Sequence, residues 1–371
     1  MPEYLFRDQP PDRLNVSGSK GSYVLANGKK YLDFGMGWCV GNSGWGNAAI
    51  EGSFRKFRGP VYVTPTAEYE GWERLSSQLV SLMPDKGMTC FRSTGGTEAV
   101  EVALKASRAF NRRKKFMAFQ NAYHGQSLAC LGLVGIHEDK FGPYPDDYVR
   151  LPSDWKKALE MAISKIRKRE ICAFISEPII ANQGVRVPPE GFLKEIREEC
   201  ERTDTVFIMD EVATGFGRTG KWFGFEHFGL EPDIVTVGKG FSSGYAPIGA
   251  TIAREGIAEK MKFPFSVYST FGWHPLSVEA SIANIKYIRK KGLVENSRRM
   301  GEYLAGKLAE FRPEGKGLCV GFDQKNSDFE KDCLEQGMIV YSFNTKVVLF
   351  PSLEVSKKEI DRAVEIIKEC A

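Results

Sequence analysis

The stretch that decides the fold runs from Asp233 to Tyr245 and reads DIVTVGKGFSSGY. A short apolar run that ends in a lysine and is followed by glycines and serines predicts a buried strand that delivers Lys239 into a turn at its carboxyl end. Open α/β sheets bind their ligands at this end of the strands. Loss of water around an ammonium group favours the neutral, nucleophilic amine, which a Schiff-base lysine needs. The alternative is a lysine in a solvent-exposed loop.

A second strand pattern lies earlier, in TVFIMDEVATGFGRTG (205–220), and its apolar run ends in the carboxylate of Asp210. The spacing leaves room for a connection and a neighbouring strand, so Asp210 and Lys239 could face one cleft. A carboxylate that pairs with a pyridinium nitrogen, opposite a lysine that holds an aldehyde, is the arrangement that pyridoxal phosphate needs as an electron sink. Seen alone, Asp210 could equally cap a helix or a turn.

These motifs carry a resemblance to a known family. The run 210–220, the lead PDIV (232–235) into Lys239 and the tail SGYAPIGA (243–250) resemble the class III (subgroup II, omega) aminotransferases of PLP fold type I. The resemblance extends from about Val24 to the carboxyl end. It implies an α/β fold with a large domain, built on a mostly parallel seven-stranded sheet flanked by helices, and a smaller α+β domain from both chain ends.

The length of 371 residues favours one large and one smaller domain. We predict an N-terminal segment (1–50) that joins the small domain, a large cofactor-binding domain (51–275) and a C-terminal small domain (276–371). The sequence Asn27-Gly28 between two alternating runs predicts a β-hairpin. Ser356 to Glu359 has the pattern of a capping box before a final helix.

Composition indicates an ordinary globular protein, with 42% hydrophobic and 26% charged residues and a formal charge of only +4. Neither a nucleic-acid signal nor an apolar run of membrane length is present, and the amino terminus lacks a signal-peptide pattern. The eight cysteines show no metal-ligand or disulfide spacing. We therefore expect a cytoplasmic protein without a metal site, and without a membrane or nucleic-acid partner.

A glycine-rich turn precedes a predicted helix in CFRSTGGTEAVEVALK (90–105). Free backbone N–H groups at such a helix start can bind phosphate, although a capped helix without any ligand has the same pattern. The resemblance assigns the cofactor phosphate to this turn, with Gly96 and Thr97 as the contacting residues.

The resemblance assigns further contacts to the ends of predicted strands. Tyr123 matches the aromatic residue that stacks on the pyridine ring, and Val212 should press on the opposite face. Glu177 matches a glutamate that bonds near the ring and shapes the substrate side. Trp38, in a glycine-rich stretch, is a candidate wall of the substrate pocket, although a core tryptophan is an alternative.

The resemblance also implies a homodimer. Thr270 matches the threonine that reaches the phosphate from the partner subunit. Each site would then be completed across the interface, and an isolated monomer would be inactive.

One departure from the family concerns substrate binding. Many members that use 2-oxoglutarate carry an arginine near the carboxyl end, whose planar fork binds the α-carboxylate. Val348 occupies that position here. Unless Lys346 or Arg186 substitutes, this contact is missing, and Arg186 is therefore a second candidate for the substrate pocket.

The resemblance implies transfer of an amino group between an amine or amino acid and an oxo acid or aldehyde by a ping-pong mechanism. Lys239 would bind the cofactor and move the substrate proton, and Asp210 would keep the ring nitrogen protonated. Two alternatives remain open. A racemase, epimerase or aminomutase could use the same site, and a non-catalytic or dinucleotide-binding α/β protein would require these motifs to be coincidental.

Overall fold

The strands that end near Asp210 and Lys239 are neighbours in the middle of a seven-stranded sheet. The computed structural model describes residues 14–343 and 345–371. Within the sheet, β10 is antiparallel to β4 and β9, and all other neighbours are parallel, which confirms the predicted mostly parallel sheet. In sheet order the strands are β4 (Thr89–Ser93), β10 (Gly249–Ala253), β9 (Ile234–Val237), β8 (Val206–Asp210), β7 (Ile171–Ser176), β5 (Lys115–Phe119) and β6 (Tyr148–Leu151).

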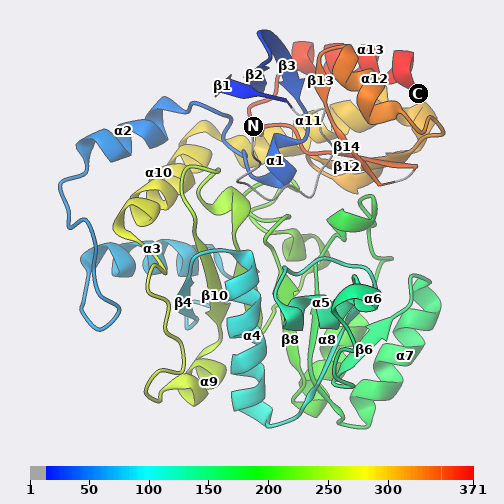
Figure 1. Ribbon diagram of the computed structural model, residues 1–371. Coiled ribbons are helices and arrows are strands. Elements are labelled where there is room, and N and C mark those ends of the chain that lie inside the picture. The colour runs from blue at the N-terminus through cyan, green and yellow to red at the C-terminus, as the bar shows by residue number, and fades with distance from the viewer. Residues whose placement is uncertain (1–13, 344) are drawn as a thin grey trace.

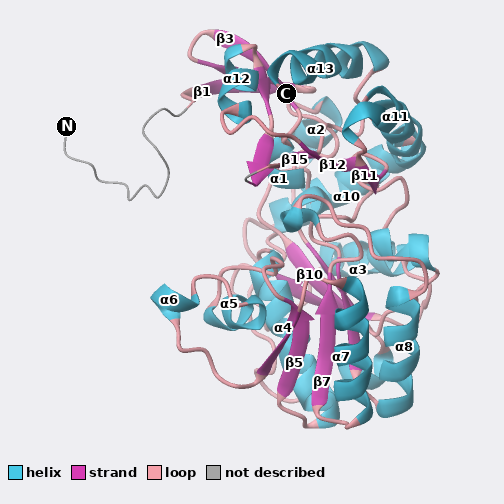
Figure 2. Ribbon diagram, turned by 90° about the vertical axis from the view of Figure 1, so that its right-hand side faces the viewer, coloured by secondary structure: helices cyan, strands magenta, loops and turns pink. Residues whose placement is uncertain are grey.

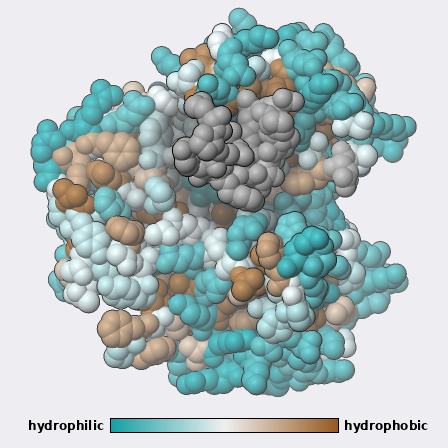
Figure 3. Space-filling model, in the orientation of Figure 1, coloured by the Kyte–Doolittle hydropathy of each residue, from teal (hydrophilic) through white to brown (hydrophobic). Residues whose placement is uncertain are grey.

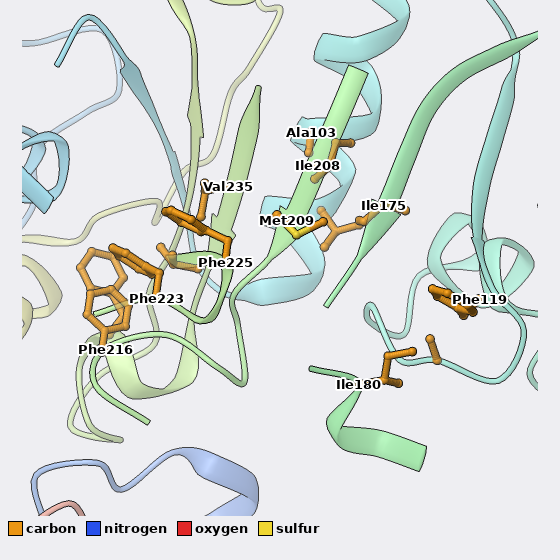
Figure 4. Close-up of a cluster of buried hydrophobic side chains, with 14 of the residues drawn as sticks. Ala103, Phe119, Ile175, Ile180, Ile208, Met209, Phe216, Phe223, Phe225 and Val235 are labelled. Atoms are coloured by element: carbon orange, nitrogen blue, oxygen red, sulfur yellow. The ribbon is translucent and has the colours of Figure 1, made fainter. Parts of the chain in front are cut away.

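The central strands form because they consist almost entirely of apolar residues that are buried on both faces. Every residue of β7, β8 and β9 is buried, as expected for parallel strands covered by helices. Figure 4 shows Ile175, Ile208 and Met209 beside Ala103, with Phe216, Phe223 and Phe225 close by. This packing fixes the strand ends from which the polar side chains of the site project.

Helices lie against both faces of the sheet (Figure 2). Two of them, α4 and α5, pack together, and α7 and α8 form another pair. The helices of this part of the chain are α2 (Ala48–Lys56), α3 (Glu70–Leu82), α4 (Gly96–Asn111), α5 (Leu128–Val134), α6 (Glu138–Phe141), α7 (Trp155–Arg167), α8 (Phe192–Thr203) and α9 (Glu255–Ala258).

Residues from both ends of the chain form a smaller region next to the large sheet (Figure 1). The predicted hairpin at Asn27-Gly28 is present, because β2 and β3 pair antiparallel on either side of two residues with positive φ. β13 adds to β3 in parallel, so the two ends share one sheet. The strands of this region are β1 (Val16–Lys20), β2 (Tyr23–Ala26), β3 (Lys29–Asp33), β11 (Glu314–Lys316), β12 (Cys319–Asp323), β13 (Met338–Ile339), β14 (Tyr341–Phe343) and β15 (Lys346–Leu349).

The remaining helices are α1 (Met36–Cys39), α10 (Pro275–Lys291), α11 (Leu293–Lys307), α12 (Phe329–Glu335) and α13 (Lys357–Cys370). Gly292 separates α10 from α11 and has a left-handed conformation that suits glycine. The predicted capping box of α13 is confirmed, with reciprocal hydrogen bonds between Ser356 and Glu359. None of the helices within 14–343 and 345–371 combines the length and apolar character that crossing a membrane requires.

A fully buried arginine connects the smaller region to the segment that follows Asp210. Arg218 donates hydrogen bonds to the side chain of Asn42 and to the carbonyl oxygens of Leu318 and Pro351. Because a buried guanidinium without such acceptors would be costly, this contact holds three distant segments in one arrangement. It fixes the smaller region above the carboxyl ends of the large sheet.

We propose that the chain divides into an N-terminal segment (1–50), a large domain (51–275) and a C-terminal small domain (276–371). Residues 1–13 of the N-terminal segment lie outside the described residues. The shared sheet of β3 and β13 supports grouping the N-terminal segment with the C-terminal domain. α10, on the C-terminal side of the boundary, packs against α2 and α3, so contact across the division is extensive.

Candidate active site

A cavity of about 430 Å³ opens at the carboxyl ends of the parallel strands, facing the smaller region. Eight of the ten predicted site residues line it: Trp38, Gly96, Thr97, Tyr123, Glu177, Asp210, Val212 and Lys239. The other lining residues are Cys39, His124, Gly125, Ala181, Asn182, Ala213, Phe343 and Phe350. The structure therefore brings together residues that are far apart in the sequence, from both parts of the chain.

Lys239 lies two residues beyond the end of β9, where a short 3₁₀ turn begins. Its backbone φ is +40°, which side-chain-bearing residues rarely adopt. Such strain costs about 1–3 kcal/mol and is found where a side chain must be held in place for function. Among the described residues, no carboxylate forms an ion pair with its amine. The amine is thus held at the cavity without a counter-ion.

Asp210 is the last residue of β8, is only 2% exposed, and has partners for both carboxylate oxygens. Oδ1 accepts hydrogen bonds from the hydroxyl of Thr236 (3.0 Å) and the backbone N–H of Val212 (3.1 Å). Oδ2 lies 2.7 Å from Nδ1 of His124. These contacts fix the orientation of the carboxylate in a water-poor site, where electrostatic interactions are strong.

His124 is a site residue that the sequence did not identify as a partner of Asp210. It is 3% exposed, and its Nε2 has no hydrogen-bond partner among the described residues. The position of His124 just after β5 was visible in the sequence. The contact with Asp210 was not, because it depends on the order in which the strands assemble.

Glu211 follows Asp210 in the chain but faces away from the cavity. Its carboxylate accepts hydrogen bonds from Thr214 (2.6 Å) and from the backbone N–H groups of Gly224 (2.9 Å) and Phe225 (2.8 Å). Burial raises its pKa to about 7, against these hydrogen bonds, which lower it. Its contacts are those of a group that organises the turn after β8.

The first turn of α4 faces the cavity with its backbone N–H groups free of any side-chain cap. The approach of the chain here is close, since a Cβ atom on Gly96 would lie 2.9 Å from Cγ1 of Val212. In the same way, a Cβ atom on Gly125 would lie 2.7 Å from the hydroxyl oxygen of Thr97. A helix start of this kind binds anions such as phosphate.

The opposite wall of the cavity is aromatic and comes from the smaller region. Trp38 stacks on Tyr341 with ring centroids 4.0 Å apart, and Phe343 lies 5.2 Å from Trp38. Phe350 also lines the cavity. Beside them the buried thiol of Cys39 has a raised pKa, because burial outweighs the opposing effect of the Lys239 and Arg218 charges. Phe343 and Phe350 were not predicted from the sequence.

Glu177 lies directly after β7 and is 4% exposed. One carboxylate oxygen accepts a long hydrogen bond, 3.4 Å, from the backbone N–H of Ala181, and the other has no partner among the described residues. Burial raises the pKa of Glu177 to about 8; the Asp210 charge adds to this and the Lys239 charge opposes it. A buried carboxyl group with one oxygen unpartnered among the described residues therefore lines the cavity.

The structure does not bring Arg186 to this cavity. Its guanidinium lies over the ring of Trp155, 4.3 Å from the centroid, and donates to the side chain of Gln183 and the carbonyl of Ser153. It lines a separate small pocket together with Lys346, whose amine is paired with Asp323 at 2.7 Å. The loop conformation after β7 directs Arg186 away from Glu177.

Thr270 is also absent from the cavity, but for a different reason. It is exposed, in the segment between β10 and α10, outside the residues that line the site of its own chain. Val348 is fully buried in β15 and packs with Cys39 and Phe350, so no polar group takes the place of the family's arginine at that position.

Comparisons with known proteins find relatives that match along nearly the whole chain. The family model described as "Aminotransferase class-III" matches residues 6–371. The acetylornithine aminotransferase of Archaeoglobus fulgidus is 34% identical over 98% of this chain and 97% of its own. Among solved structures, an aminotransferase of Bacillus anthracis superposes with a TM-score of 0.93 at 26% identity, over 99% of this chain and 96% of that one. An (S)-enantioselective omega-transaminase of Thermomicrobium roseum gives 0.91 at 25% identity, over 99% and 95%.

Proposed function

Since the chain belongs to the class-III aminotransferases, we propose that the cavity around Lys239 is the pyridoxal-phosphate site of a transaminase. The chain is a PLP-dependent transaminase of fold type I, whose substrates are an amine or amino acid and an oxo acid. Nothing in the comparisons favours the racemase or aminomutase alternative. We propose below which residues of the cavity perform the reaction.

The residues around the cavity fit this cofactor. Pyridoxal phosphate supplies an aldehyde that condenses with amines and a pyridinium ring that withdraws electrons from the bond broken at the substrate carbon. The amine of Lys239 would hold the aldehyde and move the proton at the substrate carbon. Its positive backbone φ, and the lack of an ion pair to its amine within 14–343 and 345–371, support this role.

Asp210 would hold the proton on the ring nitrogen. Its carboxylate is fixed by Thr236 and His124 and needs no reorganisation during the reaction, which is the condition for strong electrostatic stabilisation. His124 would act as a positioning residue, since it contacts the carboxylate. Tyr123 and Val212 line the same cavity and would contact the ring.

The start of α4 would bind the phosphate. Gly96 and Thr97 present backbone N–H groups there, and the close approach of Val212 to Gly96 leaves no room for a side chain. Glu177 and Trp38 would contact the substrate on the side of the smaller region.

The meeting of Lys239 and Asp210 in one cavity carries the proposal. It is tested by mixing the loaded enzyme with single amines in the absence of any oxo acid. The expected result is one equivalent of carbonyl product for each active site, with the cofactor left in its aminated form. A D-amino acid formed from an L-amino acid without loss of the amino group would instead support the racemase alternative.

We also propose that the enzyme is a homodimer. Large apolar side chains are exposed near Thr270, and Figure 3 shows hydrophobic residues on the flank where α2 lies. Tyr62 lies 6.1 Å from Phe271, measured between ring centroids, and Phe265 lies 6.0 Å from Tyr268. The exposed fractions are 84% for Val61, 79% for Phe265 and 62% for Phe271. An exposed apolar patch of this kind is typical of a subunit interface.

The role of Thr270 across this interface can be tested with mixed dimers. Thr270→Ala is expected to weaken cofactor binding about tenfold or more, because a hydrogen bond to a charged group contributes about 1.5–3 kcal/mol. A dimer of one Thr270→Ala chain and one Lys239→Ala chain should regain one intact site, since Lys239 and Thr270 of the partner subunit would then both be present. Sedimentation and cofactor titration of the purified mixed dimer measure this. A mixed dimer that binds cofactor no better than Thr270→Ala alone would show that Thr270 acts within its own chain.

A cytoplasmic location is a further proposal. All eight cysteines are free thiols and seven of them are buried, as is usual in a reducing compartment.

A further inference from the structure

The cavity contains a carboxyl group, that of Glu177, to which the proposed proton transfers assign no role. Asp210 has three hydrogen-bond partners, and Glu211 has three of its own outside the cavity. Glu177 has one long contact to Ala181 and a second oxygen that is buried and has no partner in the part of the chain that the structure describes. A buried carboxyl oxygen without a partner is costly, which indicates that a ligand supplies the missing contact.

The charges around Glu177 do not include a cation that could pair with it permanently. Lys239 is the only lysine or arginine that lines the cavity among the described residues, and its amine is assigned to the cofactor. Val348 is buried at the position of the family's arginine, and Arg186 and Lys346 point into another pocket. The groups that influence Glu177 from neighbouring elements are Asp210 and Glu211, both acidic, and Lys239.

The wall opposite the sheet has the chemistry of a cation site. Trp38, Phe343 and Phe350 line the cavity, and the stack of Trp38 on Tyr341 holds the tryptophan in place. Faces of aromatic rings attract ammonium groups, with Trp the strongest, and the attraction grows when water is excluded. Within the described part of the chain, the same wall has no arginine whose paired N–H groups could bind a carboxylate.

We propose that Glu177 and the aromatic wall of Trp38, Phe343 and Phe350 select amine donors that carry a second positive charge, such as linear diamines. This rests on the proposed function, because one amino group of the substrate reacts at Lys239. The other ammonium group is held by the ring faces and by Glu177, because a nearby cation favours the ionised form of a carboxyl whose pKa burial has raised. Donors that end in a carboxylate are disfavoured, since they would place a further negative charge beside the acidic groups Glu177 and Asp210.

The variant Glu177→Gln separates this role from simple hydrogen bonding. Glutamine keeps a donor and an acceptor of similar shape but cannot carry a negative charge. If Glu177 only donated a hydrogen bond to a neutral or anionic substrate, glutamine would replace it well. If it pairs with an ammonium group, glutamine loses that interaction.

The test uses three donors with the same chain and different far ends: butylamine, 1,4-diaminobutane and 4-aminobutanoate. Their binding is measured at equilibrium, by the absorbance of Lys239→Ala protein loaded with pyridoxal phosphate, where turnover does not deplete them. We expect 1,4-diaminobutane to bind about tenfold or more tightly than the other two, as a charge-assisted contact allows. In the Lys239→Ala/Glu177→Gln protein this advantage should fall about tenfold, with butylamine nearly unchanged.

Two controls accompany the measurement. Glu160→Gln removes a negative charge from the exposed face of α7, away from the cavity, and should leave all three dissociation constants unaltered. Trp38→Leu should weaken binding of the diamine more than that of butylamine, and it tests the aromatic wall without altering the carboxyl.

The outcomes distinguish a failure of diamine selection from a failure of the proposed transaminase site. Equal binding of the three donors, or tighter binding of 4-aminobutanoate, would overturn the selection of a second cation and leave the transaminase site intact. If butylamine and the diamine both fail to change the spectrum in wild-type and variant proteins, the assignment of the cavity itself is wrong, and the inference falls with it.

Discussion

Lys239→Ala is expected to lose multiple-turnover transamination, with kcat reduced by about 10²- to 10⁴-fold from the loss of proton transfer alone. The reduction should be larger in practice, because the same amine is proposed to hold the cofactor aldehyde. Folding should be little affected, because the Lys239 side chain makes no ion pair among the described residues. Alanine can also keep the same backbone conformation, with φ of +40°. Steady-state rates with a saturating donor and acceptor measure the effect.

A matched control keeps the interpretation specific. Lys358→Ala removes an exposed lysine from α13 and should retain full activity. Small primary amines added to Lys239→Ala should restore part of the rate, because they can move the proton in place of the missing side chain. Retention of more than about a tenth of the wild-type kcat without added amine would place the proton transfer on another residue.

Asp210→Asn is expected to lower kcat by about 10²- to 10³-fold, the usual effect of removing one preorganised electrostatic contact. Asparagine keeps an acceptor for Thr236 and Val212 but cannot stabilise a protonated ring nitrogen. Cofactor affinity should fall much less than the rate, since α4 and Lys239 would still hold the group. Rates of single turnover and equilibrium cofactor titration distinguish the two effects.

The neighbouring carboxyl provides the control for this prediction. Glu211→Gln replaces a group that is equally buried but bonded to Thr214, Gly224 and Phe225 outside the cavity. It should cost about 1–3 kcal/mol of stability, while the folded fraction keeps its kcat within a few-fold. A kcat loss in Glu211→Gln as large as that in Asp210→Asn would mean that charge near β8, and not the specific contact of Asp210, determines the rate.

Much of the fold followed from local patterns in the sequence. The apolar runs that end in Asp210 and Lys239 are adjacent strands of one sheet, and the hairpin at Asn27-Gly28 and the capping box at Ser356 are present. Each of these depends on residues that are close in the sequence. The burial of strands on both faces leaves few alternatives for such runs.

The contacts between distant segments could not be predicted from the sequence. The pairing of His124 with Asp210 depends on which strands become neighbours, and the wall formed by Phe343 and Phe350 depends on how the smaller region sits above the sheet. The direction of Arg186 is decided by its loop and by the ring of Trp155. No periodicity or spacing contains this information, because a side chain in a loop has several directions open to it.

Reductive labelling shows which lysine holds the cofactor, and we expect it to be Lys239. The wild-type protein is loaded with pyridoxal phosphate, treated with borohydride, digested, and mapped by mass spectrometry. We expect a single reduced adduct on the peptide that contains Lys239, lost when the protein is first saturated with an amine donor. An adduct on a different lysine, with the Lys239 peptide unlabelled, would contradict it.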